Sequence, residues 1–107
     1  MTNDGFFNGS LTIDELVREA HLTAIDKGWW ISPRSDLELH ALIHTEIAEA
    51  SEAFRTGNPT LQVEELADAV IRIADMCGYK RWDLAQAVAI KLAYNKTRAY
   101  RHGNKLA

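Results

Sequence analysis

The sequence predicts an all-α fold, an up-and-down four-helix bundle, and three observations lead to this prediction. Four segments carry apolar residues with the 3.6-residue period of an amphipathic helix, and no segment alternates with the two-residue period of a strand. The connectors between these segments are short, which favours antiparallel neighbours. A chain of 107 residues with 47% hydrophobic content fits one domain with a single modest core.

Capping residues and glycines set the boundaries of the four predicted helices. Three of them begin at a Thr, Ser or Asp that is followed three residues later by Glu or Gln, the pattern of a capping box. The helices are predicted from Thr12 to Gly28, from Ser35 to Arg55, from Leu61 to Cys77 and from Asp83 to about Tyr100. We expect Gly78 to end the third helix and Gly103 to end the fourth.

Composition and charge exclude several classes of function. The net charge is −3 and the pI is about 5.7, so no overall positive field attracts nucleic acid or an anionic membrane. Cys77 is the single cysteine and cannot form an intrachain disulfide, which suits a reducing compartment. Residues 1–11 lack the basic and apolar regions of a signal peptide. We therefore expect a cytoplasmic protein with no nucleic acid and no membrane as partners.

The second predicted helix places a carboxylate in the middle of its apolar face. Each helical residue advances about 100° around the axis, so the apolar residues of this helix fall on both sides of Glu46, and Glu49 lies at the edge of their face. These apolar residues are Leu39, Leu42, Ile43, Ile47, Ala50 and Phe54. A buried carboxylate is costly unless it is paired, neutralised or bound to a metal. Without a partner in the fold, we expect Glu46→Leu to leave the metal-free protein at least as stable as wild type.

The third predicted helix carries one charged stripe, formed by Glu65, Asp68, Arg72 and Asp75. By itself such a stripe is typical of a solvated helix face. Together with Glu46, it could instead face the second helix across a polar seam, where Asp75 holds Arg72 and the other acids bind metal. Carboxylates that converge repel one another, and Mg²⁺, or Mn²⁺ as a substitute, relieves that repulsion.

The fourth predicted helix changes from apolar to polar along one face. Leu84 and Val88 are followed on the same stripe by residues with basic and amide side chains, which are Lys91, Asn95, Arg98 and His102. One interpretation is that these cations stabilise a helix C-terminus. The other is phosphate binding, in which Lys supplies a point charge, Arg a bidentate fork and Asn a neutral donor.

These motifs together resemble the MazG-like family of all-α nucleoside triphosphate pyrophosphohydrolases. The resemblance is carried by ExxE at residues 46–49, ExxD at 65–68 and KLAYNKTRAYRHG at 91–103. DKGWW at 26–30 and VEELADAVIRIAD at 63–75 are also similar to members of this family. The resemblance covers residues 12–105, and we expect a single MazG-like domain over residues 1–107 with its helical core at about 12–102.

The resemblance implies an enzyme that converts an NTP or dNTP to the monophosphate and pyrophosphate, in the role of nucleotide-pool housekeeping. It implies that the metal-binding and catalytic residues are Glu46, Glu49, Glu65 and Asp68. It implies that Lys91, Asn95 and Arg98 bind the phosphates. Members of the family form homodimers or homotetramers with sites near the interfaces, so the resemblance also implies a homo-oligomer.

Two interpretations remain open for the aromatic residues after the first helix. Trp29 and Trp30 either stack on a nucleotide base or close one end of the bundle. Trp82 and Cys77 are expected in the core.

The alternative function is a non-catalytic helical module that binds a nucleotide or a protein. A requirement for Mg²⁺ distinguishes the enzyme from this module. A di-iron bundle is disfavoured, because no histidine follows a glutamate at the Glu-x-x-His spacing.

Overall fold

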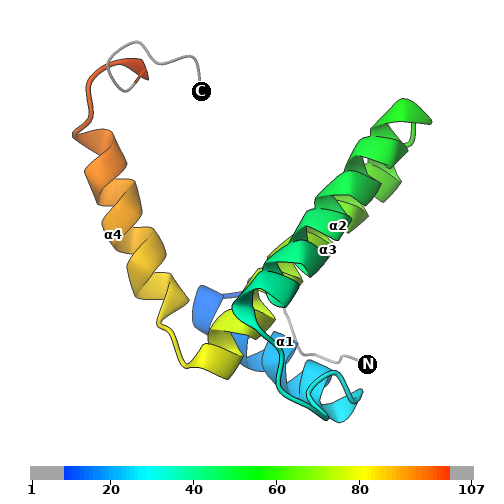
Figure 1. Cartoon of the computed structure of the whole chain (residues 1–107). Coiled ribbons are helices and arrows are strands. Elements are labelled where there is room, and N and C mark those ends of the chain that lie inside the picture. The colour runs from blue at the N-terminus through cyan, green and yellow to red at the C-terminus, as the bar shows by residue number, and fades with distance from the viewer. Residues whose placement is uncertain (1–8, 102–107) are drawn as a thin grey trace.

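The computed structural model describes residues 9–101 and contains four helices in this part of the chain (Figure 1). The helices are α1 (Ile13–Asp26), α2 (Asp36–Arg55), α3 (Pro59–Lys80) and α4 (Leu84–Lys96). Residues 9–101 include no strand, so the predicted all-α class is confirmed. None of these helices is both long and apolar enough to cross a membrane.

The starts of the three helices predicted from capping boxes are confirmed by their capping hydrogen bonds. Thr12 forms a complete capping box with Glu15: its hydroxyl accepts from the Glu15 N–H at 3.0 Å, and its own N–H donates to the Glu15 carboxylate at 2.8 Å. The hydroxyl of Ser35 accepts from the N–H of Glu38 at 3.1 Å, and Asp83 caps α4 in the same way. The capping residues therefore set the register of three helices.

The third helix is longer at both ends than the sequence predicts. Asn58 caps it, accepting from the N–H of Leu61 at 3.0 Å, and Pro59 occupies the first helical position, where its missing N–H costs nothing. Gly78 does not end α3, which continues to Lys80. A Cβ on Gly78 would lie 2.7 Å from the Cβ of His21. This glycine is thus explained by the close approach of α1 rather than by a helix end.

The fourth helix is shorter than predicted, because its last turn tightens. Thr97 and Arg98 donate their backbone N–H groups to carbonyls three residues back, at 3.0 and 3.2 Å. The Thr97 hydroxyl also donates to the Tyr94 carbonyl at 2.7 Å. Helix α4 therefore ends at Lys96 and not near Tyr100. His102 and Gly103 lie outside the described residues.

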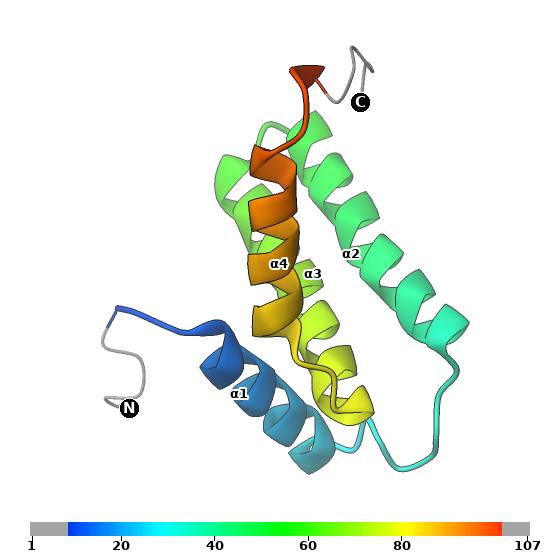
Figure 2. The same cartoon turned by 90° about the vertical axis from the view of Figure 1, so that its left-hand side faces the viewer.

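The arrangement of the helices differs from a closed bundle. Helix α3 packs along both α1 and α2, whereas α4 contacts α1 and points away from α2 and α3 (Figures 1 and 2). The chain leaves α3 through Arg81, whose φ of 61° turns it into the following connector. The up-and-down four-helix bundle is thus not seen within one chain over the described residues.

The core consists mainly of small side chains between the helices. Its buried residues are Ala20, Leu39, Ala50, Ala53, Ala69, Ala74, Met76 and Cys77. Five alanines allow the helix backbones to approach closely. The prediction that Cys77 is buried is confirmed, but Trp82 is 51% exposed, and its prediction as a core residue is wrong. Trp82 follows α3 in the connector to α4, with the ammonium of Lys80 5.2 Å from its ring centroid.

Gly78 generates a test of this packing. Gly→Ala within a helix normally stabilises a protein by about 0.5–1 kcal/mol. At position 78 we expect the opposite, a loss of about 1–3 kcal/mol, because the new methyl group meets the side chain of His21 and lies 3.3 Å from the carbonyl oxygen of Val17. Urea denaturation of Gly78→Ala measures this loss, with Ser51→Ala at an exposed site of α2 as the control. An increase in stability would contradict the packing.

Candidate metal centre and adjoining pocket

Three carboxylates converge between α2 and α3. Glu46 and Glu49 lie one turn apart on α2, and Glu65 approaches them from α3. One oxygen from each of the three lies within 4.8 Å of the others. Glu46 is buried, Glu65 is half-buried and Glu49 is exposed, so the group opens to solvent at one side. Three hard oxygen ligands from two helices fit a divalent cation such as Mg²⁺.

The electrostatics of this group are most visible at Glu65. Partial desolvation raises the pKa of Glu65, and the charges of Glu49, Asp68 and Glu46 raise it further. Asp68, one turn along α3, is not part of the mutually close group of three, but it borders that group. The structure thus brings three of the four predicted ligands together and leaves the fourth beside them.

The buried carboxylate of Glu46 has a partner within the fold. The Nε of Arg72 on α3 donates to a Glu46 carboxylate oxygen at 2.6 Å, with the Glu46 side chain 9% exposed and the Arg72 side chain 31% exposed. The position of Glu46 on the inner face of α2 is as predicted. The expectation that it lacks a protein partner is wrong. The polar seam between α2 and α3 exists, and this ion pair crosses it.

Asp75 belongs to a different network from the one predicted. It does not hold Arg72; one of its carboxylate oxygens lies 2.8 Å from Nδ1 of His21 and accepts from the indole N–H of Trp30 at 2.9 Å. His21 comes from α1, 54 residues away in sequence, so no local spacing could have identified this pair. The charged stripe of α3 therefore faces both α1 and α2, with Glu65, Arg72 and Asp75 half-buried and Asp68 exposed.

The two adjacent tryptophans have different environments. Trp30 stacks on Tyr79, with ring centroids 3.9 Å apart and an interplanar angle of 6°, and its N–H is used by Asp75. Trp30 is thus fixed as a structural residue. Trp29 is 48% exposed, and the guanidinium carbons of Arg34 and Arg72 each lie 5.5 Å from its ring centroid. Of the pair, Trp29 is the more exposed.

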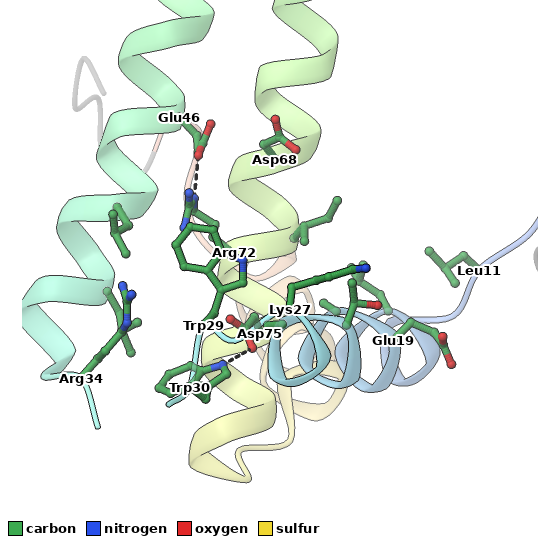
Figure 3. Close-up of a pocket in the computed structure, with 17 residues that line it drawn as sticks. Leu11, Glu19, Lys27, Trp29, Trp30, Arg34, Glu46, Asp68, Arg72 and Asp75 are labelled. Atoms are coloured by element: carbon green, nitrogen blue, oxygen red, sulfur yellow. Dashed lines mark hydrogen bonds and ion pairs between the residues drawn. The ribbon is translucent and has the colours of Figure 1, made fainter. Parts of the chain in front are cut away.

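A pocket of about 500 Å³ lies between α1, α2 and α3, beside the carboxylates (Figure 3). Its size falls in the range of small-molecule sites. Trp29, Leu39 and Leu42 contribute apolar wall, and Arg72 and Glu46 contribute polar wall where the pocket approaches the carboxylate group. The arrangement can hold an aromatic or apolar group in the pocket while a charged group reaches the carboxylates.

The predicted phosphate-binding residues lie apart from the carboxylates within one chain. Lys91 and Asn95 are exposed on α4, and Arg98 follows its end. The Lys91 ammonium and the Arg98 guanidinium carbon lie 5.0 and 5.5 Å from the ring centroid of Tyr94. Because α4 points away from α2 and α3, these side chains form a separate basic patch (Figure 1).

The comparisons with known proteins give no match: no protein-family model fits the chain, and no curated protein or solved structure is significantly similar to it.

The Glu46–Arg72 ion pair reverses the stability change expected for Glu46→Leu. Removing one partner of a fully buried pair costs about 3–5 kcal/mol. Because Arg72 is 31% exposed and can turn to water, we expect about 1–2 kcal/mol in metal-free buffer. Glu52→Leu is the control, since Glu52 pairs with Arg55 at 2.7 Å on the surface and should lose less than about 0.5 kcal/mol. Urea denaturation that finds Glu46→Leu as stable as wild type would contradict this.

The raised pKa of Glu65 predicts a pH-dependent stability. A carboxyl whose pKa is raised by folding destabilises the folded state when it is ionised. This destabilisation is absent below the ordinary value of 4.5 and is complete above the raised value. Glu65→Gln should therefore raise the melting temperature of the metal-free protein at neutral pH, and the gain should vanish as the pH falls toward 4.5. Thermal melts in EDTA across this range test it, with the exposed neighbour Glu64→Gln as control; a gain independent of pH would refute it.

Proposed function

We propose that this chain is a Mg²⁺-dependent nucleoside triphosphate pyrophosphohydrolase of the MazG-like kind. The observation that carries the proposal is the convergence of three carboxylates from α2 and α3, one of which, Glu46, also lines a pocket with an exposed tryptophan. These carboxylates belong to the ExxE and ExxD motifs on which the family resemblance depends. A triphosphate at the carboxylates with its base in the pocket uses both features at once.

Each residue of the site has a role in this proposal. Glu46, Glu49 and Glu65 would hold Mg²⁺, with Asp68 beside them to complete the ligand set. Bound Mg²⁺ would neutralise charge on the phosphates and lower the pKa of an attacking water. Trp29 stacks on the base, and Trp30, held by Asp75, fixes the connector that carries Trp29.

The proposal includes a homo-oligomer, because one chain leaves large apolar surfaces uncovered. Phe54 is 70% exposed at the end of α2, Val63 is 65% exposed on α3, and Ile90 is 63% exposed on α4. Large apolar side chains exposed to this degree are typical of surface that a second copy covers. A second copy that covers it can bring the Lys91, Asn95 and Arg98 of its own α4 to the carboxylates of the first.

A non-catalytic helical module remains the second candidate, since the basic patch of α4 lies apart from the carboxylates in one chain. Such a module needs neither Mg²⁺ nor turnover, so the catalytic assay below separates the two.

The proposed activity predicts release of pyrophosphate from a panel of ribo- and deoxynucleoside triphosphates in the presence of Mg²⁺. Glu49→Gln and Asp68→Asn should each lower turnover by about 100-fold or more, because each removes a charge from the site. Glu52→Gln, an exposed glutamate of the same α2, should keep wild-type turnover. Orthophosphate and a nucleoside diphosphate as first products would exclude a pyrophosphohydrolase, and no turnover for any nucleotide would favour the module.

The shared site predicts complementation between two inactive variants. Glu49→Gln and Lys91→Ala are each expected to be inactive alone. If α4 of one copy serves the carboxylates of the other, a mixed dimer has one site with both changes and one intact site. After unfolding and refolding together, an equal mixture should recover about a quarter of wild-type activity. Glu49→Gln mixed with Glu65→Gln, both on the carboxylate side, is the control and should stay inactive. No recovery in the first mixture would show that each site is built by a single chain.

A further inference from the structure

Arg72 lies between Trp29, which lines the pocket, and Glu46, which belongs to both the pocket wall and the carboxylate group (Figure 3). Its Nε donates to the buried carboxylate of Glu46, and its guanidinium carbon lies 5.5 Å from the ring centroid of Trp29. Among the described residues, the bond to Glu46 is the only hydrogen bond made by this guanidinium. The Arg72 side chain thus contacts both Glu46 of the carboxylate group and Trp29 of the pocket.

The position of Arg72 conflicts with a second cation at Glu46. The guanidinium already supplies a positive charge 2.6 Å from one Glu46 oxygen, and an oxygen of Glu46 is also part of the three-carboxylate group. A divalent cation there would compete for the same carboxylate and repel the guanidinium at short range in a partly desolvated site. The guanidinium can move away from Glu46, because the Arg72 side chain is 31% exposed and lines the pocket.

We infer that Arg72 is the internal counter-cation of the carboxylate group, and that binding of a divalent cation displaces its guanidinium from Glu46 toward Trp29. The inference rests on the proposed function only in taking the three carboxylates as a cation site. In the cation-free protein, Arg72 satisfies Glu46 and offsets one of the negative charges of the carboxylate group. In the cation-bound protein, its donors face the pocket, where they can meet acceptor groups of a ligand.

This exchange makes the two regions interdependent. A residue that must leave Glu46 before the cation binds weakens cation affinity, and a ligand that holds the displaced guanidinium in the pocket strengthens it. By reciprocity, the cation strengthens binding of that ligand by the same factor. Arg72 is therefore a positioning residue that couples cation binding to occupancy of the pocket.

Calorimetric titration of Mg²⁺ into the full chain tests the exchange through the identity of residue 72. Arg72→Gln removes the competing charge, so it should bind Mg²⁺ at least about fivefold more tightly than wild type. Arg72→Lys keeps a charge near Glu46 and should stay close to wild type. Arg55→Gln breaks the exposed pair with Glu52 and should not change affinity, so it is the matched control. A residue that only supported the fold would instead give weaker Mg²⁺ binding in Arg72→Gln.

A second measurement follows Arg72 in the wild-type protein and does not depend on a variant that folds. The NMR signal of its side-chain Nε–H, assigned by its loss in Arg72→Lys, should shift during the Mg²⁺ titration as the bond to Glu46 breaks. Mg²⁺ binding with an unchanged signal, or with equal or weaker affinity in Arg72→Gln, would overturn the inference and leave the proposed function intact. No Mg²⁺ binding to any of these proteins would overturn the cation site of the proposed function, and the inference with it.

Discussion

The ion pair between Glu46 and Arg72 is the interaction on which the arrangement of α2 and α3 depends. It lets a carboxylate lie on the inner face of α2, where an unpaired charge would be costly. It also turns the charged stripe of α3 toward α2, which brings Glu65 close to Glu46 and Glu49. Arg72 also lies over the ring of Trp29 and lines the pocket. The carboxylate group, the pocket and the seam between α2 and α3 therefore all depend on the Glu46–Arg72 ion pair.

Turning the charged stripe inward has a consequence for the opposite side of α3. Its apolar residues are left on the surface, and Val63, Leu66, Val70 and Ile73 are all exposed. Helix α4 does not cover them, because it points away from α2 and α3 (Figure 1). An ordinary amphipathic helix of a monomer buries its apolar stripe. The site and the open apolar surface thus arise from the same rotation of α3, and this links the proposed chemistry to the proposed oligomer.

Local sequence patterns predicted the features of this fold that are themselves local. Thr12, Ser35 and Asp83 start helices because a side-chain acceptor and the N–H three residues later form a cap without help from the rest of the chain. The inward direction of Glu46 follows from the helical period alone. Contacts between distant segments were beyond such patterns. Arg72 pairs with Glu46 on α2 and not with Asp75 on its own helix. Asp75 instead contacts His21 and Trp30.

One glycine and one connector show the same limit. Gly28 does follow α1 and has a φ of 86°, as expected for a helix end, but Gly78 lies inside α3 because α1 passes close to it. Short connectors favoured a closed bundle, yet the connector at Arg81 directs α4 outward. The sequence contains the residues of the carboxylate group, and only the packing of α2 on α3 decides which of them converge.

The central claim is that the carboxylates between α2 and α3 bind a divalent cation. Anomalous diffraction from crystals grown with Mn²⁺ tests it most directly, because the signal locates the ion without reference to activity. The account predicts a Mn²⁺ peak within coordination distance of Glu46, Glu49 and Glu65. A Mn²⁺ peak elsewhere on the chain, or no peak at these residues at saturating Mn²⁺, would contradict it.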